Sequence, residues 1–466
     1  MERIKRFIKT ALTYLAGNLL SKIVTFFLIP LYSNKLTPAE YGDYDVVTTI
    51  VSLLVSVAFF QIWDGMFRMS FDFSEKGEKL NIISICLKGY GIAVIIYSVF
   101  YYIIMTFVMN QKFVILPYIF GITFGLQFMY SFSARVFLRN KLFVFSGAAS
   151  TLVIALINVI LILYFNMGVQ ALFIAQIVGC LVQILIIELE LHLTSNLFSN
   201  KFDVKILKNV LKFSVPLCVA TISYWLLTGF TKIVINRFCG LEENGLFAIA
   251  SSLANVAVIA VNVFQFAWNE MAYLMANEVN RSVTYKKCLD LLFCTVWVCC
   301  AAFCSFISVI FPYYIGKAFQ SSLVVIPYLM IGVSANAIAG FLGTLFMTER
   351  KTNFIMISTF LAAAVNIVFC VFATQTFGLT GAVLVLSLSF IVLMILRLIQ
   401  IKREINVVLS NKMLFSLIPV AMSVFMTVFK VSPALNIGYI FLLIICYIIL
   451  LQKYMGIPFK RIMGLK

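Results

Sequence analysis

Residues 353–400 read NFIMISTFLAAAVNIVFCVFATQTFGLTGAVLVLSLSFIVLMILRLIQ, and this stretch decides the class of fold. It is almost entirely apolar, and it divides near Gly378 into two segments, 353–373 and 378–400. A helix of about 20 apolar residues is long enough to cross the hydrocarbon core of a bilayer. The stretch therefore predicts two consecutive membrane-spanning helices joined by a short turn.

Twelve further segments of this kind occupy most of the chain. With 63% hydrophobic and 11% charged residues, the chain exceeds the apolar content of soluble domains, which are near half apolar and about a quarter charged. Lipid must therefore be the solvent for much of the surface, and we predict an all-α integral membrane protein with about fourteen spans. The other predicted spans are 8–33, 43–67, 81–107, 113–134, 142–165, 169–193, 209–235, 244–268, 289–311, 323–347, 413–430 and 436–452.

The distribution of cations tests this number of spans. With the N-terminus in the cytoplasm, 27 Lys and Arg residues fall on the cytoplasmic side, 5 fall outside, and 3 lie within the spans. The cytoplasmic set counts Arg397, at the end of the twelfth span, with the loop that follows. Cytoplasmic loops carry the excess of Lys and Arg in membrane proteins, so we predict that both termini are cytoplasmic. The net charge of +17 then reflects membrane orientation and not a nucleic-acid partner. The apolar run to about residue 31 exceeds a signal-peptide core, which indicates an uncleaved first helix.

Cysteine and histidine provide no material for a metal site. Most of the 11 cysteines lie in apolar segments, and no Cys-x-x-Cys pair has a second pair or clustered histidines to complete a site. We interpret them as small buried hydrophobic residues. Because His192 is the single histidine, zinc sites and serine–histidine catalysis are excluded, and we expect no metal, no cofactor and no catalytic residue.

The chain also repeats itself. EYGDY at 40–44 opens the second span and ENGLF at 243–247 opens the eighth, an offset of 203, while glycines at 168 and 378 open the sixth and twelfth, an offset of 210. Parallel repeats are a transporter architecture with the substrate path at the interface of the halves. We predict two parallel six-helix lobes with two helices and a basic tail appended, at 1–200, 201–403 and 404–466.

Cations inside the predicted spans are the first functional candidates, because a charge near the bilayer centre costs at least ~2.5–3.5 kcal/mol on insertion scales. Lys22 lies about fourteen residues into the first span, and Lys232 lies in the outer part of the seventh, below Tyr224 and Trp225. Each lysine either snorkels to the interface or makes a local bond, or it faces a cavity and attracts a phosphate headgroup.

Other polar groups in the spans have two interpretations each. Asp64 and Arg68 are four residues apart, so they share a helix face and can pair, either as an ordinary helix-end ion pair or as a gate or ion-coupling site. An amide stripe in the eighth span suits a hydrated path or sugar contacts, or else joins helices together. The stripe consists of Asn255, Asn262 and Asn269, with Gln265 and Glu270 close to it.

Short segments spread in order over nearly the whole chain match one known family. These segments are GNLLSK (17–22), IPLY (29–32), LTPAEYG (36–42), WDGMFR (63–68), SVPL (214–217), FAW (266–268), RK (350–351) and GLTGA (378–382). On these segments the chain resembles the bacterial polysaccharide flippases of the multidrug/oligosaccharidyl-lipid/polysaccharide exporter superfamily. At Thr231-Lys232 that family often has Asp-Arg, so the cation is kept, the acid is lost, and the resemblance lends no support to ion coupling there.

This resemblance implies a flippase for a polyprenyl-pyrophosphate-linked oligosaccharide in the bacterial plasma membrane, working by alternating access and driven by a proton or sodium gradient. Lys22, Lys232 and Arg68 are expected to attract the pyrophosphate. Tyr224, Trp225 and the amides are expected to contact sugar, with Asp64 and Glu270 as ion-coupling or gating groups. Membrane lipids and other polysaccharide-assembly proteins are the remaining expected partners.

Two other functions stay open. A multidrug cation antiporter of the same superfamily needs intramembrane acids, whereas here the mid-membrane cations outnumber the acids. A membrane glycosyltransferase, ligase or polymerase usually needs a sizeable outer loop with catalytic carboxylates, whereas the longest predicted outer loop, near 312–322, has about ten residues.

Overall fold

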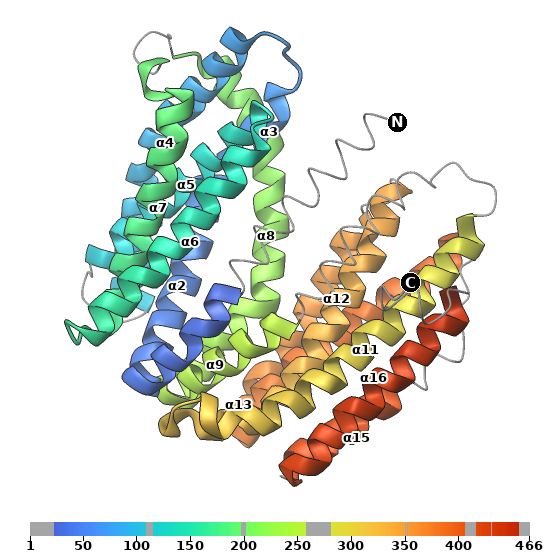
Figure 1. Ribbon diagram of the computed structural model, residues 1–466. Coiled ribbons are helices and arrows are strands. Elements are labelled where there is room, and N and C mark those ends of the chain that lie inside the picture. The colour runs from blue at the N-terminus through green and yellow to red at the C-terminus, as the bar shows by residue number, and fades with distance from the viewer. Residues whose placement is uncertain are drawn as a thin grey trace, which may run out of the picture. The chain divides into compact units, whose positions relative to one another are not determined.

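The computed structural model describes residues 23–108, 115–196, 202–257, 281–349, 351, 353–405, 416–429 and 431–455, and within these ranges it is helical with short turns and no strand (Figure 1). It divides into two compact units. The N-terminal unit is Met1–Leu31 with Asp43–Trp225, and the C-terminal unit is Tyr32–Gly42 with Leu226–Lys466. The predicted lobe boundaries stay a prediction, and the two units are described separately below.

The N-terminal unit is a bundle of apolar helices. In it, α5 packs against both α6 and α7, and α6 packs along α7. The α6–α7 contact is close because Gly179 has no side chain: a Cβ there would lie 2.3 Å from Ile154. The helices are α2 (Pro38–Ala58) from Asp43 onward, α3 (Ile62–Ser70), α4 (Lys76–Ile103), the π-helix η1 (Ile104–Val108), α5 (Ile115–Val136), α6 (Asn140–Leu163), α7 (Val169–Leu191), η2 (Thr194–Asn196) and the first part of α8 (Val204–Cys239).

The second predicted span, 43–67, is not one continuous helix. Phe60 and Gln61 both have positive φ angles, 51° and 47°, and they separate α2 from α3. Side chains with a Cβ rarely adopt this region, so two in succession need support from their surroundings. The buried Gln61 supplies part of it, because its Nε2 donates to the hydroxyl of Thr221 on α8 at 2.6 Å. The break places α3 as a separate short helix.

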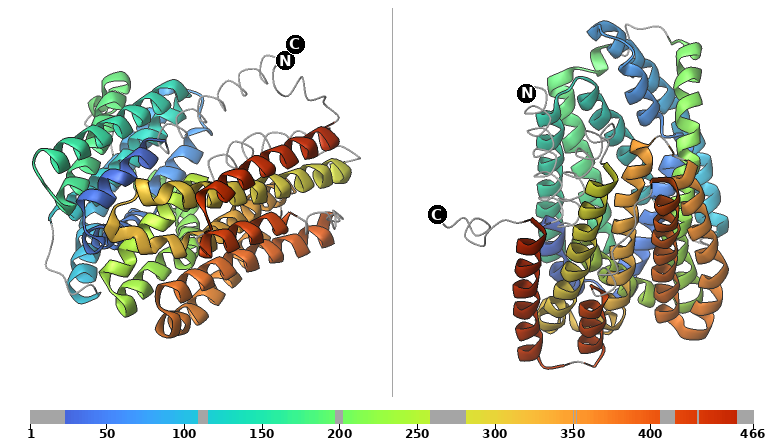
Figure 2. Two further views of the ribbon diagram at one scale, coloured as in Figure 1. Left: turned by 60° about the horizontal axis from the view of Figure 1, so that its bottom comes forward. Right: turned by 90° about the vertical axis from the view of Figure 1, so that its right-hand side faces the viewer.

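The C-terminal unit is built in the same way. Here α12 packs along α13, and α15 and α16 both pack against α11 (Figures 1 and 2). The two spans predicted on either side of Gly378 are the two arms of α13, which kinks at that glycine with φ 59° and ψ −143°. The helices are the last part of α8, α9 (Leu241–Ala257), α11 (Arg281–Tyr314), η3 (Lys317–Val324), α12 (Ile326–Thr348), α13 (Asn353–Ile405), α15 (Leu417–Val428) and α16 (Pro433–Met455).

The two copies of the Glu-x-Gly repeat meet within this C-terminal unit. A Cβ on Gly42 would lie 2.0 Å from the carbonyl oxygen of Leu241, and a Cβ on Gly245 would lie 1.9 Å from the carbonyl oxygen of Pro38. The side-chain amide of Asn244 donates to the carbonyl oxygen of Gly42 at 3.0 Å. The first turns of α2 and α9 therefore cross backbone to backbone, and only glycine fits at either position.

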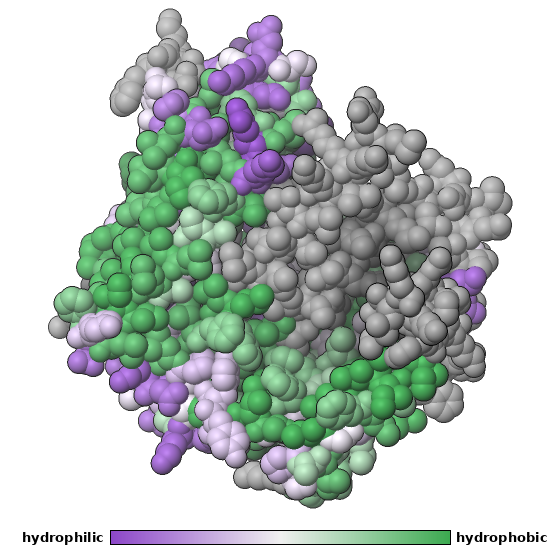
Figure 3. Space-filling model, in the orientation of Figure 1, coloured by the Kyte–Doolittle hydropathy of each residue, from purple (hydrophilic) through white to green (hydrophobic). Residues whose placement is uncertain are grey.

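The outer surfaces of these helices suit lipid. On α7, Leu181, Leu185 and Leu189 form an exposed stripe at helical spacing. Figure 3 shows apolar atoms over the middle of the visible face of the N-terminal unit, with hydrophilic atoms gathered at its two ends. Among the described residues, nine helices are long and apolar enough to cross a membrane. One of them is the 52-residue stretch Asn353–Glu404 of α13.

Candidate functional site

Asp64 and Arg68 lie on α3, but they do not pair with each other as their spacing allowed. The guanidinium of Arg68 forms its ion pair with Asp72 at 2.7 Å, and both side chains are more than half exposed. Asp64 is half-buried, and its charged neighbour is Arg135 near the end of α5. Arg68 is therefore a surface cation whose exposed ion pair contributes little stability, while Asp64 stands in a different environment.

The surroundings of Arg135 are aromatic. Its guanidinium carbon lies 4.6 Å from the ring centroid of Phe67, 4.9 Å from that of Phe132 and 5.8 Å from that of Phe143. Each ring presents its negative face to a cation at such distances. The rings hold Arg135 near the end of α5, where its charge acts on Asp64 of α3 at the predicted cytoplasmic end of the unit.

Tyr224 and Trp225 lie further along α8. The indole nitrogen of Trp225 donates to the backbone carbonyl of Thr49 on α2 at 3.2 Å, while Tyr224 is 46% exposed. The start of α8 instead approaches α3, because a Cβ on Gly65 would lie 2.6 Å from the carbonyl oxygen of Val210. Val210 and Trp225 are separated by roughly 20 Å of helix. The structure therefore does not gather Tyr224 and Trp225 with Asp64.

Lys232 belongs to the part of α8 in the C-terminal unit and is half-buried. Its neighbour Thr231 is fully buried. The amide nitrogen of Asn366 on α13 donates at 3.0 Å both to the hydroxyl of Thr231 and to the carbonyl of Leu227. The contact between α8 and α13 at this position is therefore neutral and hydrogen-bonded.

The amide stripe is described only at its start. Asn255 on α9 is exposed, and its side-chain nitrogen donates to the carbonyl of Ser251 one turn earlier at 2.9 Å. This local bond neither supports nor opposes a sugar contact. The other members of the stripe, and the lysine of the first span, lie outside the described residues; they are Lys22, Asn262, Gln265, Asn269 and Glu270.

Two buried polar arrangements were missed by the sequence reasoning. Gln183 on α7 donates to Ser131 on α5 at 3.0 Å and is bonded to Gln127 as well. Arg397, which the orientation count placed in a loop, lies inside α13 with 7% of its surface exposed. The first arrangement has a signal in the spacing of Gln127 and Ser131, one turn apart, but the burial of Arg397 has none that the sequence reveals.

Arg397 ties three helical segments together. Its Nη1 donates to the carbonyl of Ala339 on α12 at 2.6 Å, and its Nε and Nη2 donate to the hydroxyls of Ser358 and Thr359 at 3.1 Å each. Both hydroxyls belong to the first arm of α13, whereas Arg397 belongs to the second. The guanidinium fork therefore holds the two arms of α13 and α12 in one arrangement. Within the described residues no cluster of three or more His, Cys, Asp or Glu can hold a metal ion.

Comparison with known proteins identifies the family and the fold of the chain. Residues 7–268 match the model of the family described as polysaccharide biosynthesis protein. The chain is similar to the structure of the lipid II flippase MurJ in an inward closed conformation, with a TM-score of 0.71 and 14% identity over 95% of this chain and 99% of that chain. No curated protein sequence matches this chain.

Two MATE transporters share the fold as well. An inward-facing multidrug resistance MATE family transporter of the MOP superfamily has a TM-score of 0.60 and 14% identity over 84% of this chain and 94% of that chain. The Vibrio cholerae MATE transporter VcmN in its bent form has a TM-score of 0.52 and 13% identity over 92% of this chain and 98% of that chain. Together with the apolar helices, these similarities confirm the predicted all-α membrane fold of about fourteen spans.

Proposed function

Since this chain belongs to the polysaccharide biosynthesis protein family, we propose that it moves a polyprenyl-pyrophosphate-linked oligosaccharide from the inner to the outer leaflet of a bacterial plasma membrane. The match, which covers more than half of the chain, is the observation that carries the proposal. The transport works by alternating access between two lobes, it consumes a proton or sodium gradient, and it includes no chemical step on the substrate.

The charge pattern supports an anionic substrate. The pyrophosphate is the part of such a lipid that must leave water, and Lys22 and Lys232 are the cations inside the predicted spans that would attract it, with Arg68 at the predicted cytoplasmic entrance. Lysine binds phosphate as a point charge. The polar glycan would meet Tyr224, Trp225 and the amides of the eighth span, while the polyprenyl tail stays in lipid.

The competing function within the same fold is export of cationic drugs. The similarity to MATE transporters is a similarity of fold and does not select a substrate. A cationic drug needs carboxylates inside the membrane. The position before Lys232, where related chains often have an acid, holds the neutral pair of Thr231 and Asn366 instead. This observation favours the anionic substrate over the cationic one.

The experiment is to remove the protein from its native cell and to measure lipid-linked oligosaccharide on each leaflet. We expect accumulation on the inner leaflet, full rescue by the parent chain, poor rescue by Lys22→Ala and better rescue by Lys22→Arg at equal protein level. Export of cationic dyes is measured in the same cells. Normal export by Lys22→Ala refutes the headgroup role, and dye export without lipid accumulation reassigns the chain to drug transport.

A further inference from the structure

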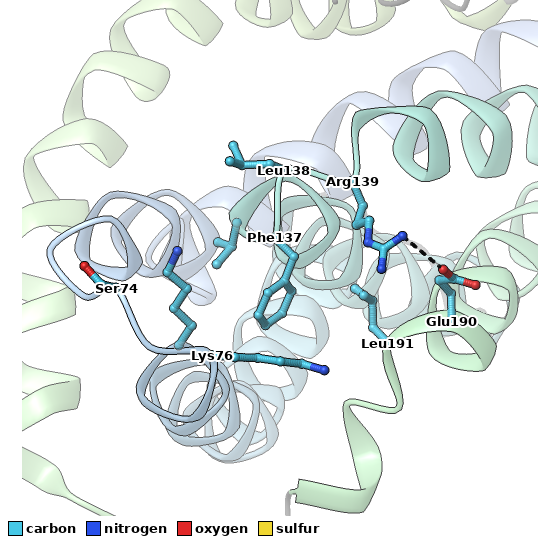
Figure 4. Close-up of a pocket in the computed structure, with 9 residues that line it drawn as sticks. Ser74, Lys76, Phe137, Leu138, Arg139, Glu190 and Leu191 are labelled. Atoms are coloured by element: carbon cyan, nitrogen blue, oxygen red, sulfur yellow. Dashed lines mark ion pairs between the residues drawn. The ribbon is translucent and has the colours of Figure 1, made fainter.

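A basic cavity opens at one end of the N-terminal unit, and its lining includes none of the residues of the proposed substrate path. Its volume is about 310 Å³, and it lies among the α3–α4 turn, the α5–α6 turn and the end of α7 (Figure 4). Both turns belong to the side that the cation distribution predicts to be cytoplasmic. The lining residues with side chains that carry the argument are Ser74, Lys76, Lys79, Phe137, Arg139 and Glu190.

The charge of this cavity is positive. Three cations and one carboxylate, that of Glu190, line it. Glu190 forms an ion pair with Arg139, with 3.5 Å between Oε1 and Nη1. In Figure 4 this ion pair lies on one side of the Phe137 ring and Ser74 on the other. Lys79 is half-buried, with its ammonium 5.8 Å from the centroid of the Phe71 ring. Because Glu190 pairs with Arg139, the positive charges of Lys76 and Lys79 are not balanced by any carboxylate among the lining residues.

Two helix N-termini add to this field. The helix α4 begins at Lys76 after the cap residue Glu75, and α6 begins at Asn140 after the cap residue Arg139. Neither cap residue makes a side-chain capping hydrogen bond. The first backbone N–H groups of a helix have no partner within the helix, and they favour an anion at this end. The cations and both helix termini thus converge on one cavity.

The rim of the cavity is apolar and exposed. Leu138, one of its lining residues, is 56% exposed and has a φ angle of 56°, a conformation that leucine rarely adopts. Phe71 and Phe73 in the α3–α4 turn are also exposed. In a membrane protein, apolar side chains at the level of the loops contact the acyl chains next to the headgroups. A ligand with both a phosphate and acyl chains satisfies the cavity and its rim together.

We propose that this cavity binds the phosphate group of an anionic phospholipid from the adjoining leaflet. The phosphate accepts hydrogen bonds from Lys76, Lys79 and the first turn of α4, and the acyl chains lie against Leu138. Basic pockets between membrane helices on the cytoplasmic side are suited to anionic headgroups. All of the lining residues belong to the N-terminal unit. The bound lipid links the two turns and the end of α7, and so stabilises this end of the bundle.

The test is thermal unfolding of the purified full chain in detergent, with phosphatidylglycerol or zwitterionic phosphatidylcholine added. We expect phosphatidylglycerol to raise the unfolding midpoint of the parent chain. In the double variant K76Q/K79Q the concentration needed for half of that rise should increase roughly tenfold or more. The control K205Q/K208Q removes the same charge from exposed lysines of α8 outside the cavity, and it should respond as the parent does.

Three outcomes overturn the proposal. The first is an equal response of K76Q/K79Q and K205Q/K208Q to phosphatidylglycerol, which reduces the effect to general surface charge. The second is a lysine-dependent rise with polyprenyl pyrophosphate and none with phosphatidylglycerol, which assigns the cavity to the substrate. The third is an equal lysine-dependent rise with inorganic phosphate alone, which removes the lipid.

A second variant keeps the test independent of the folding of the lysine variant. Leu138→Asn introduces a side chain that tolerates the positive φ angle of this position and removes the apolar contact. We expect it to weaken the response to phosphatidylglycerol and to leave the two lysines in place. An unchanged response of Leu138→Asn would separate the headgroup from its acyl chains and contradict the proposed seating of the lipid.

Discussion

Replacing Gly42 with alanine tests the crossing of the two repeat motifs. The new Cβ would lie 2.0 Å from the carbonyl oxygen of Leu241 and 2.8 Å from the backbone nitrogen of Gly245. Both distances are shorter than 3.0 Å, and Cβ atoms in proteins essentially never make contacts that short. Because both neighbours are backbone atoms, neither can rotate away, and the first turn of α2 must move. Overpacking of this kind costs about 1–3 kcal/mol.

The displacement also weakens a hydrogen bond. The amide of Asn244 donates to the carbonyl of Gly42 at 3.0 Å, and a bond of this kind contributes about 0.5–1.5 kcal/mol. We therefore expect Gly42→Ala to lower the free energy of unfolding by about 1.5–4.5 kcal/mol. Gly245→Ala acts on the same crossing, so the double variant should cost less than the sum of the two single variants.

The assay is the thermal unfolding midpoint of the purified protein in one detergent, with Gly438→Ala as the matched control. Gly438 lies exposed on α16 with no atom within 4 Å of a new Cβ, and alanine is favoured over glycine in a helix by up to about 1 kcal/mol. Gly438→Ala should therefore unfold at or above the parent midpoint. A Gly42→Ala protein that unfolds with the parent would refute the backbone-to-backbone crossing.

Three further predictions concern buried or half-buried polar side chains. Arg397→Lys keeps the charge but removes the planar guanidinium that donates to three oxygens. Losing two of these hydrogen bonds at ~1.5–3 kcal/mol each should lower the unfolding midpoint clearly. A midpoint equal to that of the parent would contradict the role of Arg397 in holding α12 and the two arms of α13 together. Asn366→Ala should cost about 1–3 kcal/mol because the buried hydroxyl of Thr231 loses its partner, measured against Asn255→Ala, whose exposed amide should be neutral. Asp64→Asn should alter the dependence of export on pH or sodium, and an unchanged dependence in flux assays assigns Asp64 to structure.

The spans could be predicted from the sequence because hydropathy acts over twenty residues at a time. Gly378 was recognised as the point where one span ends and the next begins, and it is the kink of α13. The break between α2 and α3 could not be predicted, because Phe60 and Gln61 adopt positive φ angles against their local preference. Contacts with other helices, such as that of Gln61 with Thr221, support this conformation and have no local signature.

Side-chain partners were harder to predict than helices. Arg68 has an aspartate four residues away on each side, Asp64 and Asp72, and spacing alone cannot choose between them. The choice depends on solvent and on a third residue: Asp72 is exposed with Arg68, whereas Asp64 is half-buried near Arg135, which is far away in the sequence. Arg397 shows the same limit, since a cation at the end of a span is as consistent with a loop as with a buried clamp.

The same limit bears on ion coupling. At Thr231 the side chain is neutral, and its hydroxyl is bonded to the neutral amide of Asn366, so this described contact offers no carboxylate to a coupling cation. Asp64 is a half-buried carboxylate beside a cation, and it can change charge as protons bind. If coupling depends on Asp64, Asp64→Asn changes the ion dependence of export and Asn366→Ala leaves it intact. The reverse pattern would locate coupling between α8 and α13 despite the missing acid, and loss of ion dependence in both variants would mean that the two contacts act in one conformational change.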